Sequence, residues 1–159
     1  MNAIELRPAR RADAPRLAAM SRKLIESGLE PCWTTERIER QLRSDDCVVL
    51  TARTTGEIAG FAIMQYGDDA AHLNLLAVQP AYRRLGIGRE LIGWLEETAR
   101  VAGTFAIRLE VRAANSTARA FYAALGYRET RLVPGYYQGV EDAIRLSRDL
   151  AVARSTEAR

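Results

Sequence analysis

A short turn between an apolar strand and an amphipathic helix constrains this chain more than any other feature. Residues 75–88 read LLAVQPAYRRLGIG, and the helical sequence RELIGWLEE follows directly. Unpaired N–H groups and the positive end of the helix dipole favour an anion at a helix start. Two glycines let a ligand approach the backbone, and three arginines add positive charge. These residues are Arg83, Arg84, Gly86, Gly88 and Arg89. The turn therefore predicts a phosphate-bearing ligand.

The glycine spacing excludes two common phosphate motifs. A P-loop requires Lys and then Ser or Thr after its second glycine, whereas Gly88 is followed by Arg89 and Glu90. A dinucleotide fingerprint requires a third glycine where Leu91 stands. On these residues alone, a plain strand–turn–helix joint with a fortuitous glycine pair remains the alternative.

Length and composition indicate an ordinary soluble globular protein. A chain of 159 residues with 48% hydrophobic and 27% charged residues predicts one domain, over residues 1–150, with a polar tail over 151–159. The net charge of +3 suits a polyanionic cosubstrate, and without a basic run it does not favour nucleic-acid binding. Two cysteines and one histidine leave a metal site without ligands.

The sequence predicts no export signal and no membrane span. The N-terminus MNAIELRPAR has no apolar core, and no window approaches ~18 apolar residues. The cytoplasm is the expected location, and the chain is expected to be a monomer or a homodimer.

Hydrophobic periodicity predicts four strands and two helices in the first half of the chain. The first strand is expected at Ile4 and Leu6, and the first helix from an N-cap at Asp13 to a stop at Gly28. A loop over 27–33 and a helix over 36–43, capped by Thr34 or Thr35, follow, and the two helices are expected to form a substrate lip. Three further strands are expected over 47–52, 58–64 and 72–78.

The second half predicts two helices and three strands. The helices are expected over 87–102 and 116–125, and the strands over 105–111, 127–132 and 143–148, with a loop over 134–142. A βαβ crossover makes strands 72–78 and 105–111 parallel or splayed. In the helix over 87–102, the apolar side is expected at Leu91, Leu95, Thr98 and Ala102, with Glu96 elsewhere. In the strand over 105–111, Glu110 shares a face with Arg108 and Arg112.

Two motifs in this framework resemble those of one enzyme family. Residues 83–88, RRLGIG, resemble the Q/R-x-x-G-x-G/A motif of the GNAT superfamily of acyl-CoA-dependent N-acyltransferases, which wraps the pyrophosphate of coenzyme A. Residues 115–127, NSTARAFYAALGY, resemble the second signature of the family. The element order β-α-α-β-β-β-α-β-α-β-β is also the GNAT arrangement. The resemblance implies an α/β (α+β) GNAT fold with a mixed, mostly antiparallel sheet of about six to seven strands and four flanking helices.

Further motifs resemble the RimI branch, which acetylates the N-terminal alanine of a ribosomal protein. They are LEVR at 109–112, PCWT at 31–34, and GYY followed by EDA within 135–143. The resemblance covers nearly the whole chain. The chain departs from the branch in a short loop between Val133 and Glu141 and in residues 30–32, where peptide specificity is set.

The resemblance implies acetyl-CoA as cosubstrate and assigns its contacts. The pyrophosphate would lie on the turn formed by Arg83, Arg84, Leu85, Gly86, Ile87, Gly88 and Arg89. The backbone of Leu76, Ala77 and Val78 would bind the pantetheine arm and the acetyl carbonyl, and Asn115 would also bind the arm. From the residues alone, Asn115 is a helix cap, and the two roles are compatible.

Two residues are assigned to catalysis by the resemblance. Glu110 would remove the proton of the substrate amine, directly or through water, and Tyr122 would protonate the coenzyme A thiolate. Without the resemblance, Glu110 is a strand carboxylate paired with Arg108 or Arg112, and Tyr122 is a core aromatic beside Phe121. An ordinary glutamate is a poor base, so burial or a water relay is expected to raise its effective basicity.

The acceptor is expected to be a protein α-amine. Deprotonating an α-amine at pH 7 costs ~1 kcal/mol, against ~4.6 kcal/mol for lysine, so a lone carboxylate suits the α-amine better. By resemblance Trp33, Tyr136 and Tyr137 line the acceptor groove, although packed loop anchors are an equal reading.

Two other functions stay open at this point. One is a GNAT enzyme that acts on a small amine, such as a polyamine, an amino acid or an aminoglycoside. The other is a noncatalytic acyl-CoA binding module, against which the presence of both Glu110 and Tyr122 argues.

Overall fold

The computed structural model describes residues 3–151, which divide into two compact units. Within the described residues, the first unit comprises 3–65 with 73–97, and the second comprises 66–72 with 98–151. The single domain expected over residues 1–150 stays a prediction. Residues 152–159 of the expected tail lie outside the described part of the chain.

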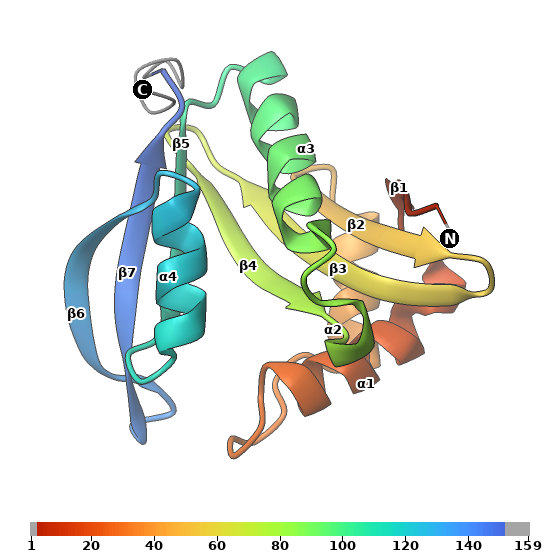
Figure 1. Ribbon diagram of the computed structural model, residues 1–159, viewed down its shortest axis with the longest axis horizontal. Coiled ribbons are helices and arrows are strands. Elements are labelled where there is room, and N and C mark those ends of the chain that lie inside the picture. The colour runs from red at the N-terminus through yellow and green to blue at the C-terminus, as the bar shows by residue number, and fades with distance from the viewer. Residues whose placement is uncertain (1–2, 152–159) are drawn as a thin grey trace. The chain divides into compact units, whose positions relative to one another are not determined.

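The elements follow the predicted order along the chain (Figure 1). Those of the first half are β1 (Glu5–Pro8), α1 (Ala14–Leu24), α2 (Thr35–Arg43), β2 (Cys47–Thr54), β3 (Glu57–Tyr66) and β4 (Ala71–Val78). Those of the second half are α3 (Ile87–Val101), β5 (Ala106–Arg112), α4 (Ser116–Ala124), β6 (Arg128–Tyr137) and β7 (Glu141–Asp149). Single 3-10 turns lie at Arg11–Asp13 and Pro80–Tyr82. The predicted GNAT element order is therefore confirmed.

The strands form a mixed, mostly antiparallel sheet with the order β1-β2-β3-β4-β5-β7-β6. β2 pairs antiparallel with β1 and β3, and β7 pairs antiparallel with β5 and β6. β4 and β5 are parallel, as the crossover predicts, with Ala71 opposite Ile107 and His72 opposite Arg108. No helix within residues 3–151 is long and apolar enough to cross a membrane.

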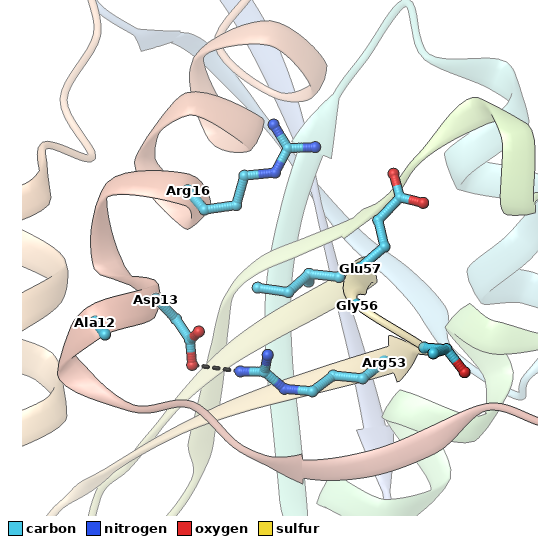
Figure 2. A pocket seen from close by; sticks show the side chains of 8 residues that line it. Ala12, Asp13, Arg16, Arg53, Gly56 and Glu57 are labelled. Atoms are coloured by element: carbon cyan, nitrogen blue, oxygen red, sulfur yellow. Dashed lines mark hydrogen bonds and ion pairs between the residues drawn. The ribbon is translucent and has the colours of Figure 1, made fainter.

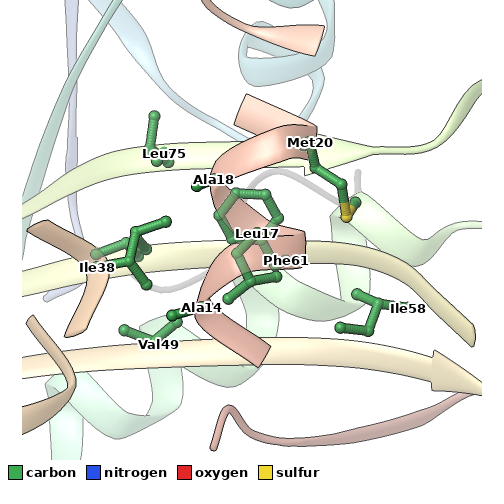
Figure 3. Packing of buried hydrophobic residues seen from close by; sticks show 11 residues of the cluster. Ala14, Leu17, Ala18, Met20, Ile38, Val49, Ile58, Phe61 and Leu75 are labelled. Carbon is green, nitrogen blue, oxygen red and sulfur yellow. The ribbon is translucent and has the colours of Figure 1, made fainter. Parts of the chain in front are cut away.

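The core of the first unit packs α1 and α2 on β2, β3 and β4. Leu17 of α1, Ile38 of α2 and Phe61 of β3 are fully buried, and Figure 3 shows Leu17 and Phe61 at the centre of the cluster. Each of these residues lies on the apolar face that the hydrophobic periodicity of its helix or strand predicted. This packing fixes the start of α2 and the loop that precedes it.

Three local predictions are wrong. Helix α1 ends at Leu24, before the expected stop at Gly28. In α3, Glu96 is fully buried, although it was expected on the polar side. The loop expected over 134–142 is much shorter, because β6 continues through Pro134 to Tyr137.

Candidate active site

The turn before α3 has an unusual backbone. Arg84 and Gly86 both adopt left-handed conformations, with φ of 68° and 79°. A non-glycine residue rarely adopts such a φ, and successive changes of backbone handedness aim neighbouring N–H groups into one concavity. Ile87 is buried and is the first residue of α3, so its side chain anchors the start of the helix directly after this turn.

The arginines of this turn are available to an anion. Arg83, Arg84 and Arg89 are exposed, and within the described residues none of them forms an ion pair. Arg83 donates from Nε to the carbonyl of Val78 at 3.3 Å, and Leu85 is 63% exposed at the tip. Fixed amides and uncompensated guanidinium groups together suit a diphosphate.

The end of β4 packs closely against β3 at Gly60. A Cβ on Gly60 would come within 2.8 Å of the Ala77 carbonyl oxygen, so only glycine permits this approach. The Ala77 side chain is buried, and those of Leu76 and Val78 are half-buried. The backbone of these residues is thus held rigidly at the strand end, which suits a role in binding through main-chain groups.

In the second unit, side chains from three other strands contact Glu110 of β5. We call these four residues the Glu110 cluster. His72 Nε2 of β4 lies 2.6 Å from Glu110 Oε1, and Tyr136 Oη of β6 donates to the same oxygen at 3.1 Å. Arg145 Nε of β7 donates to Oε2 at 2.8 Å. The Glu110 side chain is only 6% exposed. Sheet register explains the Arg145 contact, because Glu110 and Arg145 are direct partners across β5 and β7.

The cluster holds Glu110 as a carboxylate. Burial alone would raise the pKa of this carboxyl, but hydrogen bonds from His72 and Arg145, the charge of His72 and the hydroxyl of Tyr136 outweigh it and lower the pKa to about 2. Burial acts in the expected direction, but these contacts outweigh it, so burial does not make Glu110 a stronger base, and of the two expected routes only a water relay stays open as a prediction. The arginine that pairs with it is Arg145 of β7, whereas the sequence favoured Arg108 or Arg112 on its own strand.

Tyr122 and Asn115 both belong to α4. Tyr122 is 6% exposed and packs edge-to-face on Phe121 and Tyr127, with ring centroids 5.0 and 5.6 Å away. Burial, with a smaller contribution from Tyr137, raises the pKa of the Tyr122 hydroxyl, so it keeps its proton at neutral pH. Asn115 Oδ1 accepts from the Ala118 N–H at 3.0 Å, which confirms its cap role.

Tyr136 and Tyr137 lie side by side near the end of β6, with ring centroids 5.0 Å apart. Burial, and after it the Glu110 carboxylate, raises the pKa of Tyr136. Tyr136 is 43% exposed, so its ring borders the Glu110 cluster and also faces solvent. Tyr137 is half-buried and lies under Arg112, whose guanidinium carbon is 6.0 Å from the ring centroid.

The loop between α1 and α2 is anchored in the first unit by a buried glutamate that the sequence did not single out. Glu26 is 7% exposed and accepts hydrogen bonds from the backbone N–H groups of Cys32 and Trp33, the latter at 3.1 Å, and from the Ser21 hydroxyl at 3.0 Å. Trp33 packs on the core cluster, and Arg37 stacks over its ring at 3.7 Å. The Glu26 carboxylate therefore fixes the backbone that presents Trp33.

Replacing Glu26 with alanine should lower the free energy of unfolding by about 1–3 kcal/mol, because two backbone N–H groups lose their acceptor. Denaturant unfolding of the purified protein measures the change. Glu30→Ala, which removes an exposed carboxylate from the same loop, should stay within about 0.5 kcal/mol of the parent. Equal effects of the two variants would contradict the anchoring role of Glu26.

The first unit also has a polar pocket that none of the predicted site residues lines. Its lining comes from the turn before α1, from α1 itself and from the β2–β3 hairpin, and includes Asp13, Arg16, Arg53 and Glu57 (Figure 2). Asp13 is the N-cap residue of α1, as expected, but its carboxylate makes no cap hydrogen bond to that helix; it accepts from the Arg10 N–H at 2.7 Å and pairs with Arg53. Within residues 3–151, no group of three or more acidic, histidine or cysteine side chains is arranged to hold a metal ion.

Sequence reasoning missed His72 and Arg145. His72 is the only histidine, and it was considered only as a metal ligand. A usable signal was its place at the start of the strand that runs parallel to the Glu110 strand. Arg145 is 35 residues from Glu110 in sequence, and only the β5–β7 register brings the two together.

Comparisons with known proteins identify the family of the chain. The model of the acetyltransferase (GNAT) family matches residues 17–127. The chain is similar to [ribosomal protein bS18]-alanine N-acetyltransferase of Escherichia coli K12, with 42% identity over 92 residues, or 56% of this chain and 62% of the relative. The chain thus spans less than two thirds of that relative's length. It is also similar to N-alpha-acetyltransferase RimI of Mycobacterium tuberculosis, with 33% identity over 144 residues, or 87% of this chain and 88% of the relative.

A solved structure extends the similarity to the fold. The crystal structure of the ribosomal-protein-S18-alanine N-acetyltransferase from Escherichia coli superposes with a TM-score of 0.81 at 28% identity, covering 95% of this chain and 96% of that one.

Proposed function

Because this chain belongs to the GNAT family of acetyltransferases and is RimI-like within it, we propose that it transfers the acetyl group of acetyl-CoA to the α-amine of a protein N-terminus. The observation that carries this proposal is the likeness to an N-alpha-acetyltransferase over most of the chain. The Glu110 cluster supports it, because it offers a buried carboxylate beside exposed groups that can meet an amine.

The first unit supplies the diphosphate contacts in this proposal. The amides of the turn from Arg83 to Arg89 bind the pyrophosphate of acetyl-CoA, and the three arginines neutralise its charge. The left-handed backbone of Arg84 supports this role, since such conformations of non-glycine residues cluster at ligand-binding sites. The backbone of Leu76, Ala77 and Val78 binds the thioester arm. Asn115, from the second unit, binds the same arm.

The reaction proceeds by direct attack in a ternary complex. The neutral amine nitrogen attacks the thioester carbonyl carbon, a C–N bond forms and the C–S bond breaks. The proton lost by the nitrogen moves toward Glu110, directly or through an intermediary, and Tyr122 gives a proton to the departing sulfur. No acyl-enzyme forms, so a carboxylate, a hydroxyl and fixed amides are sufficient.

The acceptor in this proposal is a chain end, and Tyr136 and Tyr137 of the second unit border it. An α-amine is easier to deprotonate than a lysine amine by about 3.6 kcal/mol at pH 7. This difference matters because the Glu110 carboxylate, with its pKa lowered to about 2, is a weak base. An N-terminal alanine peptide of a ribosomal protein, the substrate named for a relative, is the first acceptor to test.

The test is release of free thiol from acetyl-CoA by the purified protein, with N-terminal peptides, lysine peptides and small amines as acceptors. We expect turnover with an N-terminal peptide to exceed that with a lysine peptide by at least ~100-fold in kcat/KM, in line with the difference in amine pKa. Glu110→Gln is the matched variant and should lose most of the activity. Turnover with small amines alone would show that a protein N-terminus is not the acceptor. If calorimetry detects no binding of coenzyme A, the proposed transfer from acetyl-CoA is wrong.

A further inference from the structure

A group of arginine side chains shares one face of the sheet with Glu110 in the second unit. Direct partners across a ladder project to the same face, as do residues two apart on one strand. Arg145 of β7 is the direct partner of Glu110 on β5 and of Arg131 on β6. The same face continues with Arg108 on β5 and Arg128 on β6, which pair with one residue of β7 between them. We call Arg108, Arg128, Arg131 and Arg145 the arginine face.

A bulge in β6 brings two of these arginines to the same face. Arg128 and Arg131 are three residues apart, so a regular strand would direct them to opposite faces. The β6–β7 ladder shifts register between Glu129 and Arg131, and Thr130 Oγ1 donates to the Arg145 carbonyl at 3.2 Å within this shift. Bulges re-aim side chains in this way and are common beside active sites. The bulge therefore adds a second positive charge from β6 to this face.

Three of the four charges lack an acidic partner among the described residues. Arg108, Arg128 and Arg131 are exposed, and within residues 3–151 none of them forms an ion pair or a side-chain hydrogen bond. Arg145 donates from Nε to Glu110 and is 34% exposed. Its two terminal nitrogens have no partner in the same part of the chain and are not buried unsatisfied atoms, so both reach solvent. The face thus offers guanidinium donors to an anion that arrives from solvent.

The arginine face breaks a rule of strand pairing that the other face of the same strands obeys. Arg131 and Arg145 lie directly opposite each other, where like charges are destabilising. On the other face Leu109 is buried, and the Glu129 carboxylate pairs with Arg119 of α4 at 2.8 Å. A local conflict that is confined to one face indicates a functional surface, because a bound anion removes the repulsion.

The position of this face relative to Glu110 indicates which anion it meets. Neighbouring strands are ~4.8 Å apart and successive residues ~3.3 Å, so the registers place Arg108 and Arg131 roughly 7 to 10 Å from Glu110. An extended polypeptide whose first residue lies at Glu110 spans that distance in about two or three residues. Carboxylates that follow closely after the N-terminus of an acceptor therefore reach the arginine face.

We propose that the arginine face binds acidic side chains of the acceptor polypeptide, so that the protein selects N-termini followed by Asp or Glu within the next few residues. This inference rests on the proposed acetyltransferase function and names its substrate class. Each contact is an exposed, charge-assisted hydrogen bond between a guanidinium group and a carboxylate. Its contribution is modest and falls when salt is added.

The decisive experiment compares kcat/KM for two acceptor peptides that share their first two residues and carry either Glu-Glu or Gln-Gln at the third and fourth positions. The parent should prefer the acidic peptide by about tenfold at low salt, the effect expected of two exposed ion pairs. The preference should shrink at high salt, because exposed charges are screened. Arg128→Gln and Arg131→Gln should each reduce the preference by about two- to fivefold.

Two controls separate charge recognition from damage to the fold. The preference is a ratio of two rates measured on one sample, so partial misfolding of a variant cancels from it. Arg7→Gln removes an exposed arginine from β1 of the first unit and should keep the preference of the parent. The double variant Arg128→Glu with Arg131→Glu should reverse the preference, so that a peptide with Lys-Lys at the same positions becomes the better acceptor.

The outcomes separate the inference from the proposed function. If the parent acetylates both peptides with equal kcat/KM, or if Arg7→Gln and Arg131→Gln change the preference equally, the arginine face does not bind the acceptor, and the acetyltransferase function stands. Binding of a single-stranded RNA that Arg131→Gln loses, without any peptide preference, would assign the face to nucleic acid and overturn the inference.

A parent that acetylates neither these peptides nor any other amine contradicts the proposed function. Calorimetric titration of the two peptides then decides the inference by itself. Selective binding of the acidic peptide that is lost in Arg131→Gln supports the arginine face as a site for acidic polypeptides, and equal or absent binding of the two peptides overturns it.

Discussion

Tyr122→Phe should lower kcat by about 10²- to 10⁴-fold and leave coenzyme A affinity unchanged within about threefold, because it removes the proton donor for the departing thiolate and little else. The buried ring keeps its edge-to-face contacts with Phe121 and Tyr127 after the hydroxyl is removed. Burial raises the pKa of the hydroxyl, so Tyr122 holds a proton across the working pH range. The same apolar surroundings disfavour a thiolate beside the ring, which drives the sulfur to accept that proton.

Tyr127→Phe is the matched control for this prediction. It removes the same atom from a neighbouring tyrosine that is 4% exposed and has no role in the proposed reaction. Thiol release at saturating acetyl-CoA, together with calorimetric titration of coenzyme A, gives both quantities for both variants. Turnover that survives in Tyr122→Phe, or is lost equally in Tyr127→Phe, means that Tyr122 is not the general acid.

The fold followed from the sequence wherever the signal was local. Ile107, Leu109 and Val111 alternate with polar residues on β5, and all three are buried. The hairpin at Thr54 to Glu57 and the helix start at Ile87 also lie where the residues predicted them. Such patterns need only the pleat of a strand or the turn of a helix, both of which repeat within a few residues.

The end of β6 shows why proline and glycine misled the prediction. Pro134 and Gly135 indicated a loop, yet both lie within β6. β6 is an edge strand of the sheet, and its pairing with β7 shifts register between Val133 and Tyr137. At an edge and beside a bulge, proline costs no ladder hydrogen bond and glycine supplies the positive φ of 62°. The position of β6 at the edge of the sheet allows Pro134 and Gly135 to lie in a strand. The local sequence does not reveal that position.

The candidate site required the same non-local information. Glu110 was identified from a motif, but its partners come from β4, β6 and β7, between 26 and 38 residues away. Arg108 and Arg112 flank it on its own strand, where residues two apart are farther from each other than direct partners across the ladder. The lowered pKa of Glu110 follows from this register, and so the character of the carboxylate could not be derived from the motif alone. The roles assigned to the site residues stay predictions.

Gly86→Val should weaken coenzyme A binding by about 10- to 100-fold, the loss expected when one charge-assisted hydrogen bond to the diphosphate, worth about 1.5–3 kcal/mol, is broken. Gly86 has a φ of 79°, a conformation that a β-branched residue does not tolerate, although no atom lies within 4 Å of the added Cβ. The bend must therefore change its backbone, and the amides that follow it lose their common direction.

Gly56→Val separates this effect from simple destabilisation. Gly56 lies in the β2–β3 hairpin of the same unit, has a φ of 77° and also has open space around its Cβ position. Both variants should lose a similar free energy of unfolding, about 1–2 kcal/mol, because the backbone strain is the same. Only Gly86→Val should lose affinity in calorimetric titration with coenzyme A. Equal affinities in the two variants would mean that the turn before α3 does not hold the diphosphate, and the anion site would then have to be sought elsewhere in the chain.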